Sequence, residues 1–451
     1  MRNSHSSRGA SVRRVVRRGR RWTVSARTVI AALAVVSVAA ACNDLTTLEQ
    51  SNPGQLGPTV FAPQNADLMV NSSRGDFECA FNEYIAASGL FMDEMADAIS
   101  QTANFDLDRR TVTPDSPYGT NTCDSQQQPG VYTPLSVARA SSDVAVQHLE
   151  GWTDEQVPNR SHLIAVASAY GGYSFVLMGE GMCSAAFDLG PEEQPAQIFA
   201  DAMVRFDTAI AAATRANDAT TLDLALLGRA RTELDLGNSA GAATDAALIP
   251  AGFEVDIDHD PTATRRQNLV FIQTIQAQFG SIDTSIINRF AADHDPRIAV
   301  TSTGELGSDG HTVVWFANKD ATPTAPQAVA KFSEAQLIIA ENDVNNGQLS
   351  DAVTILNQLR EAAGQPDYSG GLTAPAVMAD IVEQRRREFF LEGHRLGDIR
   401  RLNLPLSPAT GAPYVSGGNY GDESCFPLPN VERINNPNLD VTSAHVLTPH
   451  Q

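Results

Sequence analysis

Residues 331–364 read KFSEAQLIIAENDVNNGQLSDAVTILNQLREAAG, and this stretch decides the fold class. Its apolar residues have helical spacing. Ile339-Ala340 is followed after twelve residues by Ala352 and then by Leu359. Because small residues let two antiparallel helices approach closely, a small residue on each partner at this spacing predicts a packed helical hairpin.

A second stretch repeats this pattern, since Leu227-Gly228 is followed after twelve residues by Ala240 and then by Ala247. The first stretch has 34 residues, which is the length of a tetratricopeptide repeat, although it lacks the Trp and Tyr of that consensus. We therefore expect a mainly α fold with tetratricopeptide-like hairpins. A plain helical hairpin outside this repeat family is the alternative.

Helical spacing extends over most of the chain on both sides of these hairpins. The predicted helices cover 67–73, 77–100, 135–150, 160–180, 195–214, 221–236, 239–248 and 374–403. Two segments lose this spacing, 101–134 and 251–326, and we interpret them as irregular insertions. The second contains three runs with β-branched residues, FEVDI, IAVTS and HTVVWF.

The first 65 residues have a different composition. Residues 1–27 are rich in arginine, and the apolar run from Thr28 to Ala41 is too short to span a bilayer but suits a signal peptide. Ala39-Ala40-Ala41-Cys42 resembles the lipobox of bacterial lipoproteins, which predicts a signal peptide over 1–41 and a lipidated Cys42. Ordinary cleavage with an unmodified Cys42 is the alternative. Residues 42–65 then form a flexible tether, and residues 66–451 form one domain.

The chain is acidic, with a formal charge of −21. Residues 1–41 hold nine arginines and no acidic residue, so the rest has 23 basic and 53 acidic side chains. Such a surface repels phosphate backbones and anionic lipid headgroups, which argues against nucleic-acid binding and basic-patch membrane docking. No other stretch approaches 18 apolar residues, so we expect membrane contact through lipid alone.

Four cysteines follow Cys42. An even number in an exported chain suggests two disulfides, and the sequence permits three pairings. We favour Cys79 with Cys123 and Cys183 with Cys425. The second pair would join the C-terminal tail to the helical body.

Three C-terminal motifs together resemble the SusD/RagB family of nutrient-uptake lipoproteins. They are SEAQLIIAE at 333–341 with LNQLR at 356–360, RRREFFLEGHRLGDIRR at 385–401, and CFPLP at 425–429 with NPNL at 436–439. Asp295-Pro296-Arg297 is similar to a mid-chain motif of the same family. The match covers about 330–440, and Leu396 replaces the aromatic residue usual after His394-Arg395.

The resemblance implies a helical lipoprotein with four tetratricopeptide-like hairpins and a ligand-facing part built from insertions. It also implies capture of an oligosaccharide or another nutrient, docking as a lid on a TonB-dependent, SusC-like outer-membrane transporter, and no catalytic activity. We therefore expect a lipid-anchored protein of the outer membrane, with its domain at the cell surface. We expect no cofactor and no metal centre.

Three motifs admit other functions. Gly237-Asn238-Ser239-Ala240-Gly241 matches the G-x-S-x-G of hydrolases, but a helix precedes it where that motif needs a strand. Asp256 to Asp260 could bind Ca²⁺, although a solvated loop is the favoured interpretation. The six arginines between Arg385 and Arg401 alternate with carboxylates, which favours structural ion pairs over an anion site.

Sugar binding needs flat aromatic faces together with carboxylates and amides. The aromatic residues in irregular segments are therefore candidates: Tyr118, Tyr132, Trp152, Trp315 and Phe316. The polar candidates beside them are Asn104, Asp115, Asn121 and Asn318. Tyr118 and Trp315 are the first choices. A helical-repeat adaptor of envelope proteins without a small ligand, and an exported hydrolase using Ser239, are the competing functions.

Overall fold

The computed structural model describes residues 60–99, 102–123 and 128–439. The chain divides into two units, Met1–Val60 and Phe61–Gln451. The predicted signal peptide, Cys42 and most of the predicted tether lie outside the described residues. Helix α2 begins at Ala66.

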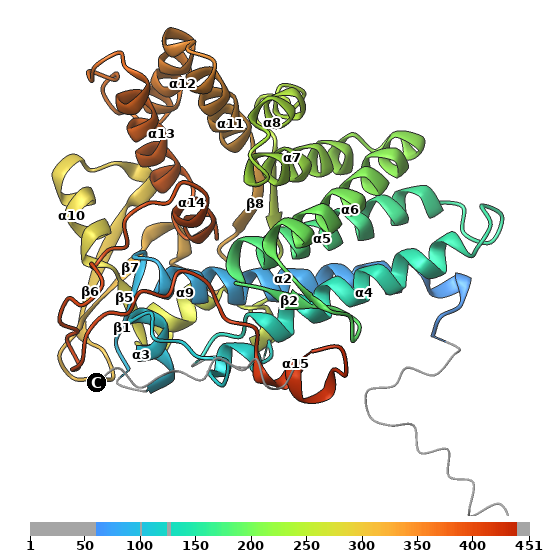
Figure 1. The fold of residues 1–451 in the computed structure, drawn as a ribbon, viewed down its shortest axis with the longest axis horizontal. Helices are drawn as coiled ribbons and strands as arrows, with labels where there is room; N and C mark the ends of the chain where they lie inside the picture. Colours follow the sequence, from blue (N-terminus) through green and yellow to red (C-terminus); the bar gives the residue numbers. More distant parts are fainter. Residues whose placement is uncertain (1–59, 100–101, 124–127, 440–451) are drawn as a thin grey trace, which may run out of the picture. The chain divides into compact units, whose positions relative to one another are not determined.

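Four pairs of helices that pack against each other form the scaffold (Figure 1). The pairs are α2 (Ala66–Phe91) with α4 (Tyr132–Glu150), α5 (Arg160–Gly181) with α6 (Pro195–Ala216), α7 (Ala219–Asp235) with α8 (Ser239–Ala246), and α11 (Phe332–Asn345) with α12 (Leu349–Ala362). Helix α13 (Ala374–Glu388) packs on α11 and α12. The expectation of a mainly α, tetratricopeptide-like fold is confirmed.

Small residues mediate the contact between α11 and α12, as the sequence predicted. Ala340 and Ala352 are both fully buried in one apolar cluster with Leu359. For the α7–α8 hairpin the predicted contact residues were wrong. A Cβ on Gly228 would lie 2.3 Å from the ring of Phe206 on α6, so this glycine allows α7 to approach α6. Ala240, however, is exposed, and Ala242 and Ala246 are the buried residues of α8.

Four two-stranded antiparallel sheets complete the fold. They pair β1 (Met95–Asp97) with β5 (Gly280–Ile282), β2 (Ala185–Ala186) with β3 (Glu192–Glu193), β4 (Glu254–Ile257) with β8 (Gln327–Lys331), and β6 (Val300–Leu306) with β7 (Val313–Ala317). Strands β4, β6 and β7 overlap the three β-branched runs of the segment that was expected to be irregular. The predicted helix over 77–100 is wrong at its end, because α2 stops at Phe91 and Met95 to Asp97 pair with β5.

Shorter helical elements lie outside the four helix pairs. They are η1 (Pro63–Asn65), α3 (Thr102–Asp108), η2 (Pro117–Gly119), η3 (Thr264–Arg266), α9 (Leu269–Phe271), the π-helix η4 (Ile272–Gln276), α10 (Thr284–Asp293), η5 (Pro296–Ile298), η6 (Asn318–Asp320), α14 (Arg395–Arg401) and α15 (Asn430–Asn435).

The segment 374–403, predicted as one helix, contains two. Helix α13 ends at Glu388 and α14 begins at Arg395. Between them Leu391 has φ 53° and Gly393 has φ 76°, and this left-handed backbone ends the helix. The turn buries Phe389, Phe390 and Leu391 completely, which compensates for the break because apolar burial is the main stabilising term.

Two disulfides join distant parts of the chain, Cys79 with Cys123 and Cys183 with Cys425. These are the two pairings that the sequence analysis favoured. The first ties the 101–134 insertion to α2, and the second ties the C-terminal tail to the end of α5.

Among the described residues, helix α5 is long and apolar enough to cross a membrane by length and composition alone. Its apolar window is 89% buried inside the fold, so its composition suits a core helix.

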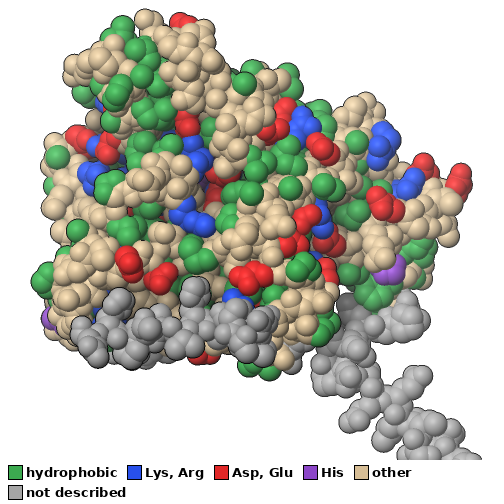
Figure 2. All heavy atoms as spheres, viewed as in Figure 1, with side chains coloured by type: hydrophobic (Ala, Val, Ile, Leu, Met, Phe, Trp, Pro, Cys, Tyr) green, Lys and Arg blue, Asp and Glu red, His purple; other side chains and the backbone are tan. Residues whose placement is uncertain are grey.

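On the surface shown in Figure 2, acidic and basic side chains are interspersed.

Candidate functional site

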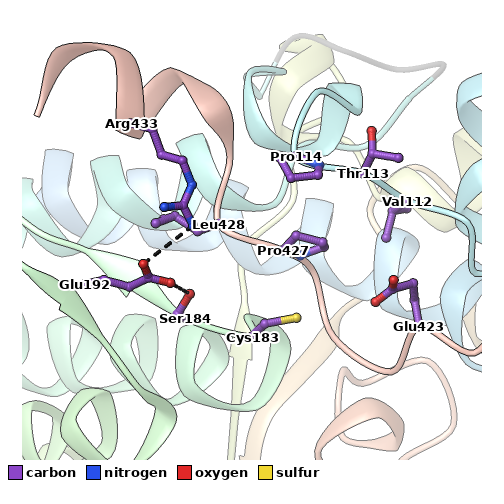
Figure 3. Close-up of a pocket in the computed structure, with 10 residues that line it drawn as sticks. All are labelled: Val112, Thr113, Pro114, Cys183, Ser184, Glu192, Glu423, Pro427, Leu428 and Arg433. Carbon is purple, nitrogen blue, oxygen red and sulfur yellow. Dashed lines mark hydrogen bonds and ion pairs between the residues drawn. The ribbon is translucent and has the colours of Figure 1, made fainter. Parts of the chain in front are cut away.

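A cavity of about 370 Å³ lies where three segments meet (Figure 3). The insertion contributes Val112, Thr113 and Pro114, the chain after α5 contributes Cys183, Ser184 and Glu192, and the C-terminal tail contributes Glu423, Pro427, Leu428 and Arg433. Its volume falls in the range of small-molecule sites. The cavity therefore lies between the irregular insertion and the tail, beside the helical scaffold.

A row of connected polar groups forms one side of the cavity. The Ser184 hydroxyl donates to a Glu192 carboxylate oxygen at 2.5 Å. The other Glu192 oxygen lies 3.5 Å from an Arg433 guanidinium nitrogen. These contacts fix the carboxylate between a hydroxyl and a cation, which prepares it to accept hydrogen bonds from a polar ligand.

Apolar side chains form the rest of the lining: Val112, Pro114, Pro427 and Leu428. Thr113 and Glu423 add oxygen atoms on the same side as Val112 in Figure 3. An apolar surface with a few oriented oxygen atoms matches a ligand that has both C–H faces and hydroxyl groups.

The tail wall is anchored to the core behind the cavity. The Cys183 amide donates to the Phe426 carbonyl and the Phe426 amide donates to the Gly181 carbonyl, both at 2.9 Å. Phe426 is fully buried and its ring stacks on Phe91, with centroids 4.6 Å apart. The tail is therefore a fixed wall of the cavity.

The prediction that Tyr118 and Tyr132 bind a sugar through their rings is wrong. These two residues are only 2% and 1% exposed. The Tyr118 hydroxyl donates to the Pro427 carbonyl at 2.5 Å, and burial raises the pKa of Tyr118 far above its usual range. The Tyr132 hydroxyl donates to the Ala186 carbonyl at 2.8 Å. Both rings pack under the cavity region and present no face to a ligand.

The other predicted residues lie outside the cavity lining. Trp315 and Phe316 are half-buried on β7, opposite Ser302 and Thr301 of β6. Trp315 packs against the main core. Asn121 is half-buried and donates to the Gln128 carbonyl at 2.7 Å.

The other residues that the sequence analysis named as candidates for sugar binding do not lie together in one site. Asp115 accepts a hydrogen bond from Asn430, and Asn318 accepts one from Thr301. Trp152 packs on a second apolar cluster at the far end of α4. Nothing is described of the Asn104 side chain.

Sequence reasoning missed the polar lining residues Ser184, Glu192 and Arg433. One signal was available, since pairing Cys183 with Cys425 brings Ser184 next to the CFPLP motif. No sequence pattern marks Glu192 or Arg433, because each reaches the cavity only through the fold.

Comparison with known proteins identifies the family to which the C-terminal motifs are similar. Residues 319–440 match the model of the SusD family. No curated protein matches the chain. Among solved structures, a SusD superfamily protein from Bacteroides vulgatus matches with a TM-score of 0.67 at 17% identity, covering 84% of this chain and 98% of that one.

Two more solved structures match over similar lengths. A SusD superfamily protein from Bacteroides fragilis has a TM-score of 0.65 at 17% identity, covering 84% of this chain and 99% of its own. Surface glycan-binding protein A from Bacteroides uniformis has a TM-score of 0.60 at 14% identity, covering 83% and 99%. The fold is thus shared over nearly the full length of these proteins.

Residues 319–440 therefore carry the sequence signature of the SusD family, and the fold of the described chain is that of SusD superfamily structures.

The SusD-family motif at 385–401 is an ion-pair centre that joins the matched region to the N-terminal helices. Arg395 pairs with Asp93 at 2.9 Å, Arg385 pairs with Asp398 at 2.8 Å, and Arg401 pairs with Glu341. All these side chains are at most 11% exposed. The arginine run is structural, as the sequence analysis favoured.

His394 of the same motif sits in the centre of this network. Its Nε2 lies 3.2 Å from an Arg231 guanidinium nitrogen, and Arg231 in turn binds Glu180 through two contacts of 2.6 Å. Burial, with Arg231 next, holds the pKa of His394 well below its usual range. The imidazole is therefore neutral and can accept the Arg231 hydrogen bond.

Across the described residues, no group of three or more His, Cys, Asp or Glu is placed to hold a metal ion. In the segment 256–260, Asp258 pairs with Arg74 at 3.2 Å and Asp260 accepts from Thr262. These carboxylates have separate partners. Ser239 lies in the first turn of α8, directly after the α7–α8 turn, so the strand that a nucleophile elbow requires is replaced by α7.

Proposed function

We propose that this SusD-family chain is an outer-membrane lipoprotein that binds an oligosaccharide and delivers it to a TonB-dependent transporter. The observation that carries the proposal is the cavity built from the insertion and the tail, in a chain whose C-terminal third matches the SusD family. Two structural neighbours support the ligand class through their names, a SusD-like carbohydrate binding protein from Bacteroides vulgatus and the glycan-binding protein from Bacteroides uniformis.

The cavity chemistry suits a sugar. Sugar hydroxyls are both donors and acceptors, so they pair with carboxylates, hydroxyls and guanidinium groups. Glu192, Ser184 and Arg433 offer all three within one connected row. The apolar lining matches the C–H face of a pyranose ring, although no aromatic ring lines the cavity.

Trp315, Phe316 and Asn121 form the second candidate surface for the same ligand. The two rings are half-buried on one strand, so part of each is accessible. A sugar can stack on such a ring. The binding experiment below separates this surface from the cavity.

The localisation and the partner are part of the proposal, and the SusD-family match and the sequence before Ala66 support them. The lipobox-like sequence at Cys42 supports a lipid anchor, and the SusD family supports docking on a SusC-like transporter. The function proposed is binding without catalysis.

The competing function is a helical-repeat adaptor, which predicts no saturable binding of a glycan. The hydrolase alternative predicts an activity that is lost in Ser239→Ala. Its geometric requirement is not met at the α7–α8 turn.

The test is a glycan array on the purified domain, followed by calorimetric titration of the best oligosaccharide. Ser184→Ala and Glu192→Gln are expected to weaken binding at least tenfold, because each removes a fixed polar partner. Thr354→Ala, an exposed change on α12, is the matched control and is expected to bind as wild type. Equal affinity in all four proteins would reject the cavity as the site.

A further inference from the structure

A second hollow of about 380 Å³ lies away from the cavity, where three helices begin. Its lining comes from the N-terminal parts of α2, α5 and α7 and from β4, and we call it the helix-start groove. Helices α2 and α5 begin at the same end of the helical layer (Figure 1). The floor is apolar: Val70, Leu163, Val166, Leu224 and Val255.

The rim of the helix-start groove is acidic. It carries the carboxylates of Asp67, Asp218 and Asp256, with Arg74 and His162 as the basic groups. Arg74 already pairs with Glu78 at 3.1 Å and with Asp258 at 3.2 Å. Because Arg74 is paired with these two carboxylates, the carboxylates of the rim give the groove a negative potential, which a cationic ligand would neutralise.

Two of the three rim carboxylates have partners. The Asp218 carboxylate accepts a hydrogen bond from the Thr221 amide and so caps α7. Its other oxygen lies 2.7 Å from His162 Nδ1. Asp67 accepts from the Asn159 side chain at 2.9 Å. Both are therefore held in place by structural contacts.

Four polar side chains of the groove have no such contacts among the described residues, namely Asn71, Thr220, Asp256 and Tyr170. Within the described part of the chain, neither the Asp256 carboxylate nor the Tyr170 hydroxyl makes a hydrogen bond or ion pair. Tyr170 is only 7% exposed, and its ring packs on Phe77 with centroids 5.1 Å apart. Because the Tyr170 hydroxyl oxygen has no partner in the described structure and is not fully enclosed, it can form a hydrogen bond with a ligand in the groove.

The charge and shape of the groove select one ligand chemistry. An anion would meet three carboxylates. A bare metal ion would need a cluster of ligands, and none is found among the described residues. An ammonium group has three donors and no acceptor, so it suits a carboxylate and a hydroxyl oxygen, and an aliphatic chain suits the apolar floor.

We propose that the helix-start groove is a second ligand site that binds an alkylammonium group carried on an aliphatic chain. Asp256 and the Tyr170 hydroxyl accept its hydrogen bonds, and the floor contacts its chain. The group can belong to a free amine or to a lysine side chain of a peptide. This site is independent of the glycan cavity.

The test compares two probes that differ only in the cation, N-acetyl-lysine amide and N-acetyl-norleucine amide, by ligand titration in NMR at low salt. Saturable binding of the lysine probe alone is expected, with affinity falling as salt rises. n-Butylamine separates the sources, since equal affinity indicates a free amine and weaker affinity indicates a peptide. Equal binding of the lysine and norleucine probes, or no binding of the lysine probe, would overturn the proposal.

Variants locate the site. Asp256→Asn and Tyr170→Phe are expected to weaken the lysine probe about tenfold and about threefold, because they remove a charged and a neutral acceptor. Glu254→Gln is the matched control, as an exposed carboxylate on the same strand that does not line the groove. A loss in Glu254→Gln equal to that in Asp256→Asn would contradict the assignment. Oligosaccharide binding by Asp256→Asn should equal wild type, which separates this proposal from the glycan proposal.

Discussion

The bond between Cys183 and Cys425 joins two walls of the candidate glycan cavity. Cys183 lies beside Ser184, and Cys425 precedes the Pro427 and Leu428 of the tail wall. We therefore predict that Cys183→Ser/Cys425→Ser weakens oligosaccharide binding and lowers the free energy of unfolding by about 2–5 kcal/mol. Calorimetric titration and urea unfolding measure the two effects. Unchanged affinity in a folded double variant would show that the tail position does not depend on this bond.

The buried pair Arg231–Glu180 makes a prediction on stability. Both side chains are 4% exposed. Arg231→Met leaves the Glu180 carboxylate buried without its partner, so we expect a loss of about 3–5 kcal/mol in urea unfolding. The combined change Arg231→Met/Glu180→Gln should recover part of this loss.

Arg229→Met on the same helix is the control for that experiment. Arg229 is 26% exposed and pairs with Asp207, which is 61% exposed, and with Asp245, which is 9% exposed. Because the arginine itself and one of its two partners reach solvent, its removal should cost less than that of Arg231, about 1–2 kcal/mol. Equal losses for Arg229→Met and Arg231→Met would contradict the role given to burial.

Asp108 makes a prediction on pH. Burial raises the pKa of this carboxyl to about 7, against hydrogen bonds from the Asp97 amide at 2.8 Å and the Tyr414 hydroxyl at 3.1 Å. Between pH 4 and pH 7 the folded state binds more protons at Asp108 than the unfolded state. The contribution of Asp108 to stability therefore falls as pH rises through this window and is constant above it.

Asp108→Asn removes this titration and keeps an oxygen acceptor. The melting temperature of the variant relative to wild type should rise by several degrees between pH 5 and pH 7.5. Glu94 and Glu334, whose pKa values burial also raises to about 7, remain in both proteins, so the difference isolates Asp108. A constant difference across this range would contradict the raised pKa.

The two candidate glycan surfaces lead to a direct comparison. Phe316→Ala removes a half-buried ring on β7 that does not line the cavity. We expect its affinity for the oligosaccharide to stay within about twofold of wild type, because stacking on a ring is worth about 0.5–1.5 kcal/mol only where a ligand contacts it. A larger loss in Phe316→Ala than in Glu192→Gln would move the site to β7.

Much of the scaffold could be predicted from local patterns. The hairpin α11–α12 has Ala340 and Ala352 at its contact, as their spacing indicated. The helix break at Leu391 to Gly393 could not be read in the same way, because helical spacing continues through it. Burial of Phe389 and Phe390 by tertiary contacts determines that turn.

The candidate site was harder to predict, because its residues come from three distant segments. Tyr118 lies in an irregular insertion, which suggested an accessible ring, yet the fold uses it to hold the Pro427 carbonyl. Glu192 gains its role only from Ser184 and Arg433. Composition identifies aromatic residues in loops, but only the packing determines which of them remain accessible.

The central proposal is that this protein, whose residues 319–440 match the SusD family, captures an oligosaccharide for a transporter. Its most direct test is affinity purification of the lipidated protein from detergent-solubilised outer membranes, with mass spectrometry of the proteins that accompany it. The account predicts a stoichiometric TonB-dependent transporter. Recovery of a different envelope protein in its place, under equally gentle conditions, would contradict the account and favour the adaptor.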